Sequence, residues 1–234
     1  MSAASPRPPD HPVGAALRGH HAPYAVSVGS AVRYHRDIAP FAALAPDPGS
    51  GDWADLAELL GPDDGAALMD PPALPGGWSA LMTFSVLRMV SAAPGAAASV
   101  VGDDIEVTTL HTDRDADEVA DLVRRTEPGP FGPRTMELGR FVGMRQQGRL
   151  VAMAGERMHP PGWTEVSAVC TDPSARGRGL ASRLVAAVTA GIHARGEGAF
   201  LHVLETNAAA VGVYARLGFT VHRTVPVVVV SPPP

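Results

Sequence analysis

A turn rich in glycine and arginine, residues 176–182, contains the residue types that most clearly suggest chemistry. It follows strand-like residues at 166–169, and leucines and valines at helical spacing come after it. The first N–H groups of a helix have no partners within the helix, and the helix dipole makes that end positive, so a phosphate can bind there. Gly177 and Gly179 let a ligand approach the backbone closely, and the neighbouring arginines add positive charge. The turn therefore predicts a site for an anionic nucleotide or coenzyme.

Alternating strands and helices must position this turn. In the second half of the chain we expect a strand, a helix capped by Thr112, a β-hairpin around Gln147 and Gly148, and then the strand and helix that flank the turn. A further strand, a short helix at 207–217 and a closing strand pair at 219–230 complete the order. The strand–helix–strand passage through the turn predicts a right-handed parallel crossover, and the whole order predicts a mixed α/β fold.

The first 102 residues are expected to form a smaller α/β domain. A helix at 53–60 and a strand at 79–90 are its clearest elements, and a stretch of small residues at 91–99 is typical of a linker. We therefore predict one domain at 1–102 and a second at 103–234. The first domain lacks the glycine-rich turn, so its expected role is to cover one edge of the second.

Composition narrows the classes of function. With 234 residues, 45% of them hydrophobic, the chain can build a core, and a net charge of −5 without a basic run argues against a nucleic-acid surface. No apolar run is long enough to span a membrane, and the N-terminus lacks a signal-peptide pattern, so we expect a cytoplasmic protein. The single cysteine, Cys170, excludes an intrachain disulfide and fits a reducing compartment.

Two residue types are informative by their absence or spacing. Lysine never occurs, which excludes a Walker A lysine and a Schiff-base lysine. None of the nine histidines forms a pair at metal-ligand spacing, so no metal is expected.

The segment 104–230 resembles the GNAT superfamily of acetyl-CoA-dependent N-acyltransferases, closest to its FR47-like branch. Two motifs carry the resemblance. The family's [QR]-x-x-G-x-[GA] loop is matched by Arg176, Gly179 and Ala181. Its N-x-x-A-x-x-x-Y-x-x-x-G-F segment is matched by Asn207, Ala210, Tyr214, Gly218 and Phe219. Two ordered motifs with suitable elements between them are far more specific than either alone.

The resemblance implies a splayed, mixed sheet flanked by helices, with the pantetheine arm of acetyl-CoA between two parting strands. Val169, Cys170 and Thr171 would pair their backbone with the pantetheine amides, and Asn207 would contact the coenzyme arm from the other side. The pyrophosphate would be held by the turn, whose residues are Arg176, Gly177, Arg178, Gly179, Leu180, Ala181 and Ser182.

The resemblance also implies catalytic roles. Tyr214 matches the family's general-acid tyrosine, and Glu165, at the start of the strand before the turn, matches the position of a glutamate base. Tyr214 is alternatively a packed core tyrosine, and Glu165 a solvated residue at a strand end. Glu156 is a weaker candidate, more typical of a salt bridge, and His202 is expected to be a hydrogen-bonded structural residue with a relay role as the alternative. Packing is the favoured role of Cys170, because its strand neighbours are apolar.

The implied function is transfer of an acetyl group from acetyl-CoA to a primary amine of a small molecule, by direct attack in a ternary complex. Two alternatives stay open, namely a non-catalytic acyl-CoA-binding sensor or scaffold and an acetyltransferase for protein amines. We expect no nucleic-acid or membrane partner, and a monomer or homodimer.

Overall fold

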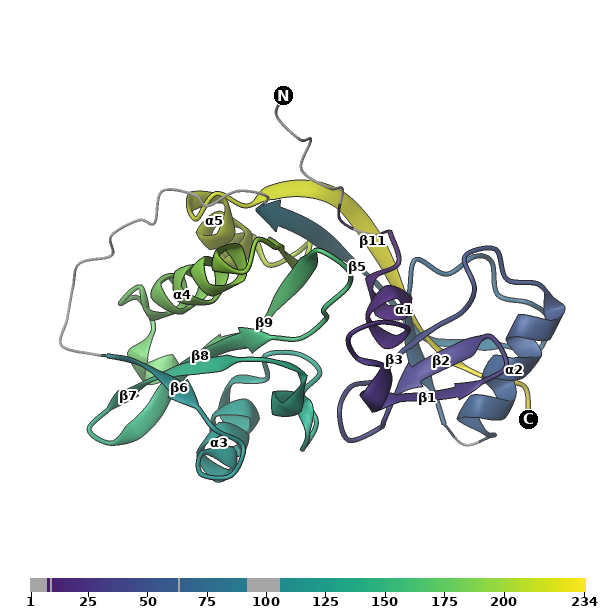
Figure 1. Ribbon diagram of the computed structural model, residues 1–234, viewed down its shortest axis with the longest axis horizontal. Coiled ribbons are helices and arrows are strands. Elements are labelled where there is room, and N and C mark those ends of the chain that lie inside the picture. Colours follow the sequence, from purple (N-terminus) through teal and green to yellow (C-terminus); the bar gives the residue numbers. More distant parts are fainter. Residues whose placement is uncertain (1–7, 9, 63, 92–105) are drawn as a thin grey trace.

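The computed structural model describes residues 8, 10–62, 64–91 and 106–234, and within them the strands form one 11-stranded mixed sheet. The strand order is β1-β2-β3-β4-β11-β5-β10-β9-β8-β7-β6. Figure 1 shows helices packed around this sheet, with the two halves of the chain joined by the long arch of β5 and β11. The expected mixed α/β fold with a sheet flanked by helices is confirmed.

The elements have the following bounds. The helices are α1 (Pro12–Leu17), α2 (Ser50–Leu60), α3 (Ala116–Thr126), α4 (Leu180–Ala194) and α5 (Ala208–Arg216). The strands of the first half are β1 (Ala25–Val28), β2 (Ala31–Tyr34), β3 (Phe41–Ala43), β4 (Ala66–Met69) and β5 (Ser79–Ser91). Those of the second half are β6 (Val107–Leu110), β7 (Phe141–Gln146), β8 (Arg149–Glu156), β9 (Trp163–Thr171), β10 (Gly198–Leu204) and β11 (Thr220–Ser231). Short 3₁₀ helices lie at Ala22–Tyr24, Thr135–Leu138 and Pro173–Ala175.

The two halves of the chain share the sheet through β5. This strand precedes the predicted boundary at residue 102, and it pairs antiparallel with β10 and with β11 from the second half. The predicted linker and boundary lie at 91–102, almost all of it outside the described residues. The division into domains at 1–102 and 103–234 stays a prediction, with the added fact that the sheet continues from one half to the other.

The closing strand pair expected at 219–230 is wrong, because these residues form the single strand β11. Pro226 does not interrupt it. The Pro226 carbonyl accepts a hydrogen bond from Asp70 N–H on the β4 side, and the N–H and C=O of one residue in an antiparallel strand point the same way. The N–H that proline lacks therefore falls at the end of β4, and pairing with β5 continues past it.

Local signals in the second half gave most element positions correctly. The expected hairpin turn is confirmed, with positive φ at Gln147 (51°) and Gly148 (78°), as a type I′ turn requires. The expected cap of the next helix is wrong, since α3 starts after Asp115 instead of Thr112. The Asp115 carboxylate accepts the His111 N–H at 2.7 Å, which shapes the preceding turn and delays the helix.

The parting of β9 and β10 is the feature that creates the site. These strands pair in parallel only at Trp163–Gly198, Thr164–Ala199 and Glu165–Phe200, although both continue beyond that point. Helix α4 connects them and packs on the sheet through Leu184, Val188 and Ile192, which confirms the expected parallel crossover pairing. The sheet is therefore open on one side of β9 from residue 166 onwards.

A β-bulge lies in the open part of β9. Two residues, Ala168 and Val169, stand opposite Ala154 of β8, and Ala168 has a left-handed φ of 52°. A non-glycine residue in this conformation is strained by about 1–3 kcal/mol, and such strain is often found at active sites and ligand clamps.

Candidate active site

A cleft of about 1390 Å³ opens where β9 and β10 part. Its walls include most residues that the sequence predicted for a coenzyme site. These are Val169, Cys170, Thr171, Arg176, Gly177, Gly179, Leu180, Ala181, Ser182, Asn207 and Tyr214. Arg178 and Glu165 are not part of the wall. Arg178 donates to Gln146 Oε1 at 2.9 Å, and Glu165 is fully buried. The structure thus brings together the two sequence motifs, which are separated along the chain by β10.

The N-terminus of α4 opens into the cleft. The helical hydrogen-bond ladder starts with Arg183 N–H donating to Gly179 O at 3.1 Å, so the N–H groups of residues 180–182 precede it. Gly177 and Gly179 have φ values of 79° and 73°, which favour glycine. A Cβ built at either glycine meets nothing within 4 Å, so the backbone is both correctly turned and accessible. This end of the helix can accept a phosphate.

The open edge of β9 offers backbone groups to an extended ligand. On one side Cys170 and Thr171 pair with Met153 and Ala152 of β8. On the other side pairing with β10 has ended at Glu165, so that edge faces the cleft. An amide-bearing chain can pair there as an additional strand.

Asn207 caps helix α5. Its Oδ1 accepts the Ala210 N–H at 3.1 Å, which gives this asparagine a structural function besides the predicted contact with the coenzyme. Its position in the cleft wall is consistent with both functions.

Tyr214 lies on α5 and is only 8% exposed, with its ring edge-on to Phe219, at 6.2 Å between ring centres. Burial raises the pKa of the Tyr214 hydroxyl to about 12, because the phenolate would be poorly solvated. At neutral pH the side chain is therefore a neutral proton donor at the wall of the cleft. This is the protonation state that a general acid needs.

Glu165 is held in a bidentate ion pair with Arg157. Arg157 Nε lies 2.8 Å from Glu165 Oε2, and Arg157 Nη2 lies 2.8 Å from Oε1. Burial alone would raise the pKa of Glu165, but the charge and hydrogen bonds of Arg157, helped by His202, lower it well below its usual range. A carboxylate so strongly stabilised as an anion is a weak base, and this weighs against the predicted role of Glu165 as the group that takes the amine proton.

His202 continues this network. Its Nδ1 lies 2.8 Å from Glu165 Oε1, and its Nε2 accepts from Arg88 Nε at 3.1 Å. Because Arg88 is a donor, the tautomer that fits carries its proton on Nδ1. Burial lowers the pKa of His202, although Glu165 opposes this, so the ring is neutral. The buried row Arg157–Glu165–His202–Arg88 matches the expected hydrogen-bonded histidine, while the two arginines were missed because their partners are remote in sequence.

The remaining candidates have structural surroundings. Glu156 is buried and pairs with Arg195 at 3.0 Å, as expected of a salt-bridge residue. Cys170 belongs to an apolar cluster beneath α3, and burial raises the pKa of its thiol, which disfavours a nucleophilic thiolate.

A histidine cluster that the sequence did not reveal lies away from this cleft. His20, His21 and His159 offer ring nitrogens within 4.8 Å of one another. Both ring nitrogens of His21 are already engaged, with Tyr34 Oη at 2.9 Å and Leu138 O at 3.1 Å. His21 is thus a satisfied buried residue, and binding a metal there would require breaking one of these bonds.

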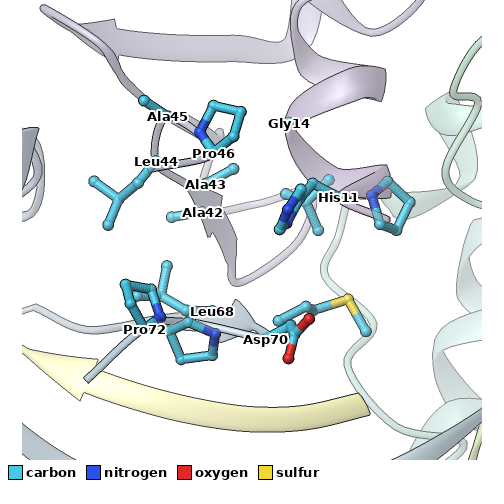
Figure 2. Close-up of a pocket in the computed structure, with 14 residues that line it drawn as sticks. His11, Gly14, Ala42, Ala43, Leu44, Ala45, Pro46, Leu68, Asp70 and Pro72 are labelled. Carbon is cyan, nitrogen blue, oxygen red and sulfur yellow. The ribbon is translucent and has the colours of Figure 1, made fainter. Parts of the chain in front are cut away.

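A second pocket, shown in Figure 2, has a volume of only about 50 Å³. It lies between the start of α1 and the ends of β3 and β4, and Asp70 in its wall is paired with Arg223. Such a volume accommodates a few water molecules and not a coenzyme. None of the described helices has the length and apolarity needed to cross a membrane.

Comparisons with known proteins agree with this geometry. The FR47-like protein family model matches residues 141–227, which include β9, α4, β10 and α5. A mycothiol acetyltransferase of Thermomonospora curvata is 33% identical over 206 residues, which are 86% of this chain and 63% of that protein. The chain therefore spans less than two thirds of the length of this curated relative.

Solved structures extend the similarity to the whole chain. A GNAT-family structure from Novosphingobium aromaticivorans is 40% identical, with a TM-score of 0.84, and the match covers 96% of this chain and 98% of that one. A GCN5-related N-acetyltransferase from Kribbella flavida shares the fold, with 20% identity, a TM-score of 0.60 and 95% of each chain covered.

Proposed function

Since the chain belongs to the GNAT family of acetyltransferases, we propose that it transfers an acetyl group from acetyl-CoA to a primary amine of a small molecule. The observation that carries this proposal is the open edge of β9 beside the N-terminus of α4 in one cleft. That combination suits a ligand with an amide-bearing arm and a pyrophosphate.

Acetyl-CoA would lie in the part of the cleft formed by the open edge of β9 and the N-terminus of α4. The backbone of Val169, Cys170 and Thr171 would pair with the pantetheine arm, and the N–H groups of residues 180–182 would bind the pyrophosphate. Arg176, whose Nε donates to Thr171 O at 3.3 Å, would add charge at the turn, and Asn207 would contact the arm from α5.

Chemistry would proceed by direct attack in a ternary complex. The amine nitrogen bonds to the thioester carbonyl carbon, the C–S bond breaks, and the sulfur leaves with the bonding electrons. Tyr214 would donate its hydroxyl proton to this thiolate and regain a proton from solvent. The nitrogen loses its proton to water.

Glu165 would act as a positioning residue in this scheme. Its ion pair with Arg157 and hydrogen bond to His202 hold two side chains that line the cleft. The alternative role of Glu165, direct abstraction of the amine proton, can be distinguished by substituting Glu165. Removal of a base should lower kcat, whereas removal of an ion-pair residue should lower the stability of the fold.

A small-molecule acceptor is supported by the relative named mycothiol acetyltransferase. The buried, reduced Cys170 fits a cytoplasmic location, and we retain a monomer or homodimer.

The test is release of coenzyme A from acetyl-CoA by the purified protein with a panel of primary amines, with the acetylated product identified by mass spectrometry. We expect amine-dependent release and an N-acetylated product. Saturable binding of acetyl-CoA without turnover of any amine would instead favour a sensor or scaffold.

A further inference from the structure

The cleft extends well beyond the opening between β9 and β10. Its volume of about 1390 Å³ exceeds the 300–1,000 Å³ that is usual for one ligand. The additional wall comes from the first half of the chain and from β11. Its apolar side chains are Phe41, Ala67, Met69, Met82, Phe84, Val86, Val227 and Val229.

These side chains form one continuous surface because they occupy alternate positions on adjacent strands. Val227 of β11 stands opposite Phe84 of β5, and Val229 stands opposite Met82. On its other side β11 pairs Val227 with Met69 and Val229 with Ala67. We call this surface the apolar floor.

Part of the apolar floor is accessible from the cleft. Leu68, Val228 and Val230, at the intervening positions, pack with Trp53 and Leu56 of α2. On the cleft side, Met82 is 59% exposed and Met69, Phe84 and Val229 are half-buried. The other floor residues, Phe41, Ala67, Val86 and Val227, are buried. A large exposed apolar side chain in a cleft indicates a surface for an apolar ligand.

The charges around the cleft limit the ligand further. Among the described residues of the wall, Glu127 is the acidic one, and it lies in the loop after α3 and not on the apolar floor. Arg157 lies over the Phe41 ring of the floor, and its charge is already paired with the buried Glu165 carboxylate. A second ammonium group on an acceptor would thus lose water without gaining an anionic partner, which is costly.

From these observations we infer that the acceptor is a primary amine carried on an apolar or aromatic body, without a second positive charge. The inference rests on the proposed function, because it assumes that the coenzyme occupies the β9–α4 part of the cleft. Its body would lie on the apolar floor, and its amine would point towards the opening between β9 and β10.

A matched pair of amines tests this directly. Hexylamine and 1,5-diaminopentane have similar lengths, but one ends in a methyl group and the other in a second ammonium. We expect kcat/KM for hexylamine to be at least tenfold higher, and phenethylamine to be accepted better than spermidine. Preference for the diamine or spermidine, with acetyl-CoA turned over, would overturn the inference and leave the proposed function intact.

Two charge substitutions on β5 locate the effect. Met82→Glu should lower kcat/KM for hexylamine at least tenfold while the Kd for acetyl-CoA stays within twofold. Leu81→Glu is the control, because Leu81 is 63% exposed and outside the cleft wall, and it should change neither value. An unchanged kcat/KM in Met82→Glu, whether or not the oligomeric state shifts, would contradict the inference. If the wild-type protein does not bind acetyl-CoA, the proposed function itself is rejected.

Discussion

Arg157 and Glu165 form a bidentate ion pair with both N–O distances at 2.8 Å, and Glu165 has no exposed surface. His202 completes the contacts of the same carboxylate. An anion buried in this way is costly to protonate or to delete, since its removal leaves the guanidinium without its counter-charge.

Glu165→Gln should therefore destabilise the fold. We expect the free energy of unfolding to fall by about 3–5 kcal/mol, the usual cost of breaking a buried ion pair. Urea denaturation at pH 7 measures it, and Glu58→Gln, at an exposed position on α2, should stay within about 0.5 kcal/mol of wild type. A Glu165→Gln protein with wild-type stability but a large loss of kcat would support the base role instead.

Tyr214→Phe tests the proposed acid. We expect kcat to fall by roughly 10²–10⁴-fold, the usual contribution of a positioned acid or base, with the Kd for acetyl-CoA within twofold of wild type. Tyr24→Phe is the control, because the Tyr24 hydroxyl donates to Glu137 O and neither residue lines the cleft. Equal turnover by Tyr214→Phe and wild type would restrict Tyr214 to packing.

The pH profile gives a second test of Tyr214. With a pKa of about 12 the hydroxyl stays protonated throughout the range in which the protein is assayed. The wild-type kcat should therefore show no loss between pH 8 and 10 that disappears in Tyr214→Phe. A basic limb in that range that only the wild type shows would mean that the hydroxyl ionises far more easily than its burial implies.

Stability should also depend on pH through His21. Burial, and then the neighbouring His159, lowers the pKa of His21 to about 4 from the ordinary value near 6.5, so the folded protein favours the neutral ring. As the pH falls from 6.5 to 4, the unfolded chain gains a proton that the folded chain resists, and stability decreases by on the order of 3 kcal/mol.

His21→Gln should flatten this decrease, measured by urea denaturation at several pH values. His222→Gln, at an exposed position on β11, should keep the wild-type dependence. If both variants show the same slope as wild type, His21 does not contribute to acid sensitivity.

The sequence could predict the parts of this protein that depend on neighbouring residues. The turn with Gly177 and Gly179, the hairpin at Gln147 and the short helix after Asn207 are local geometries, and the structure shows each of them. The placement of the turn and of Asn207 in one cleft was implied by the family resemblance that the two motifs carry.

Contacts between remote segments could not be predicted in this way. The pairing of β5 with β10 and β11 joins strands from opposite halves of the chain, and the partners of Arg88 and Arg157 are fixed only by that pairing. Glu165 shows the consequence: its position relative to the turn suggested a base, while its surroundings make it an ion-pair residue. Side chains alternate between the two faces of β5, but which face lines the cleft becomes clear only when the neighbouring strands β10 and β11 are known.

Ala181→Glu tests most directly whether the N-terminus of α4 and the open edge of β9 bind acetyl-CoA. A glutamate in the first turn of α4 suits the helix dipole, so the melting temperature should not fall, but its charge would repel the pyrophosphate. Titration calorimetry with acetyl-CoA should show saturable binding to the wild type and to Ala190→Glu, at an exposed position further along α4. For Ala181→Glu we predict a Kd at least tenfold weaker. Equal affinity in the folded Ala181→Glu protein, or no binding to wild type, would contradict the account.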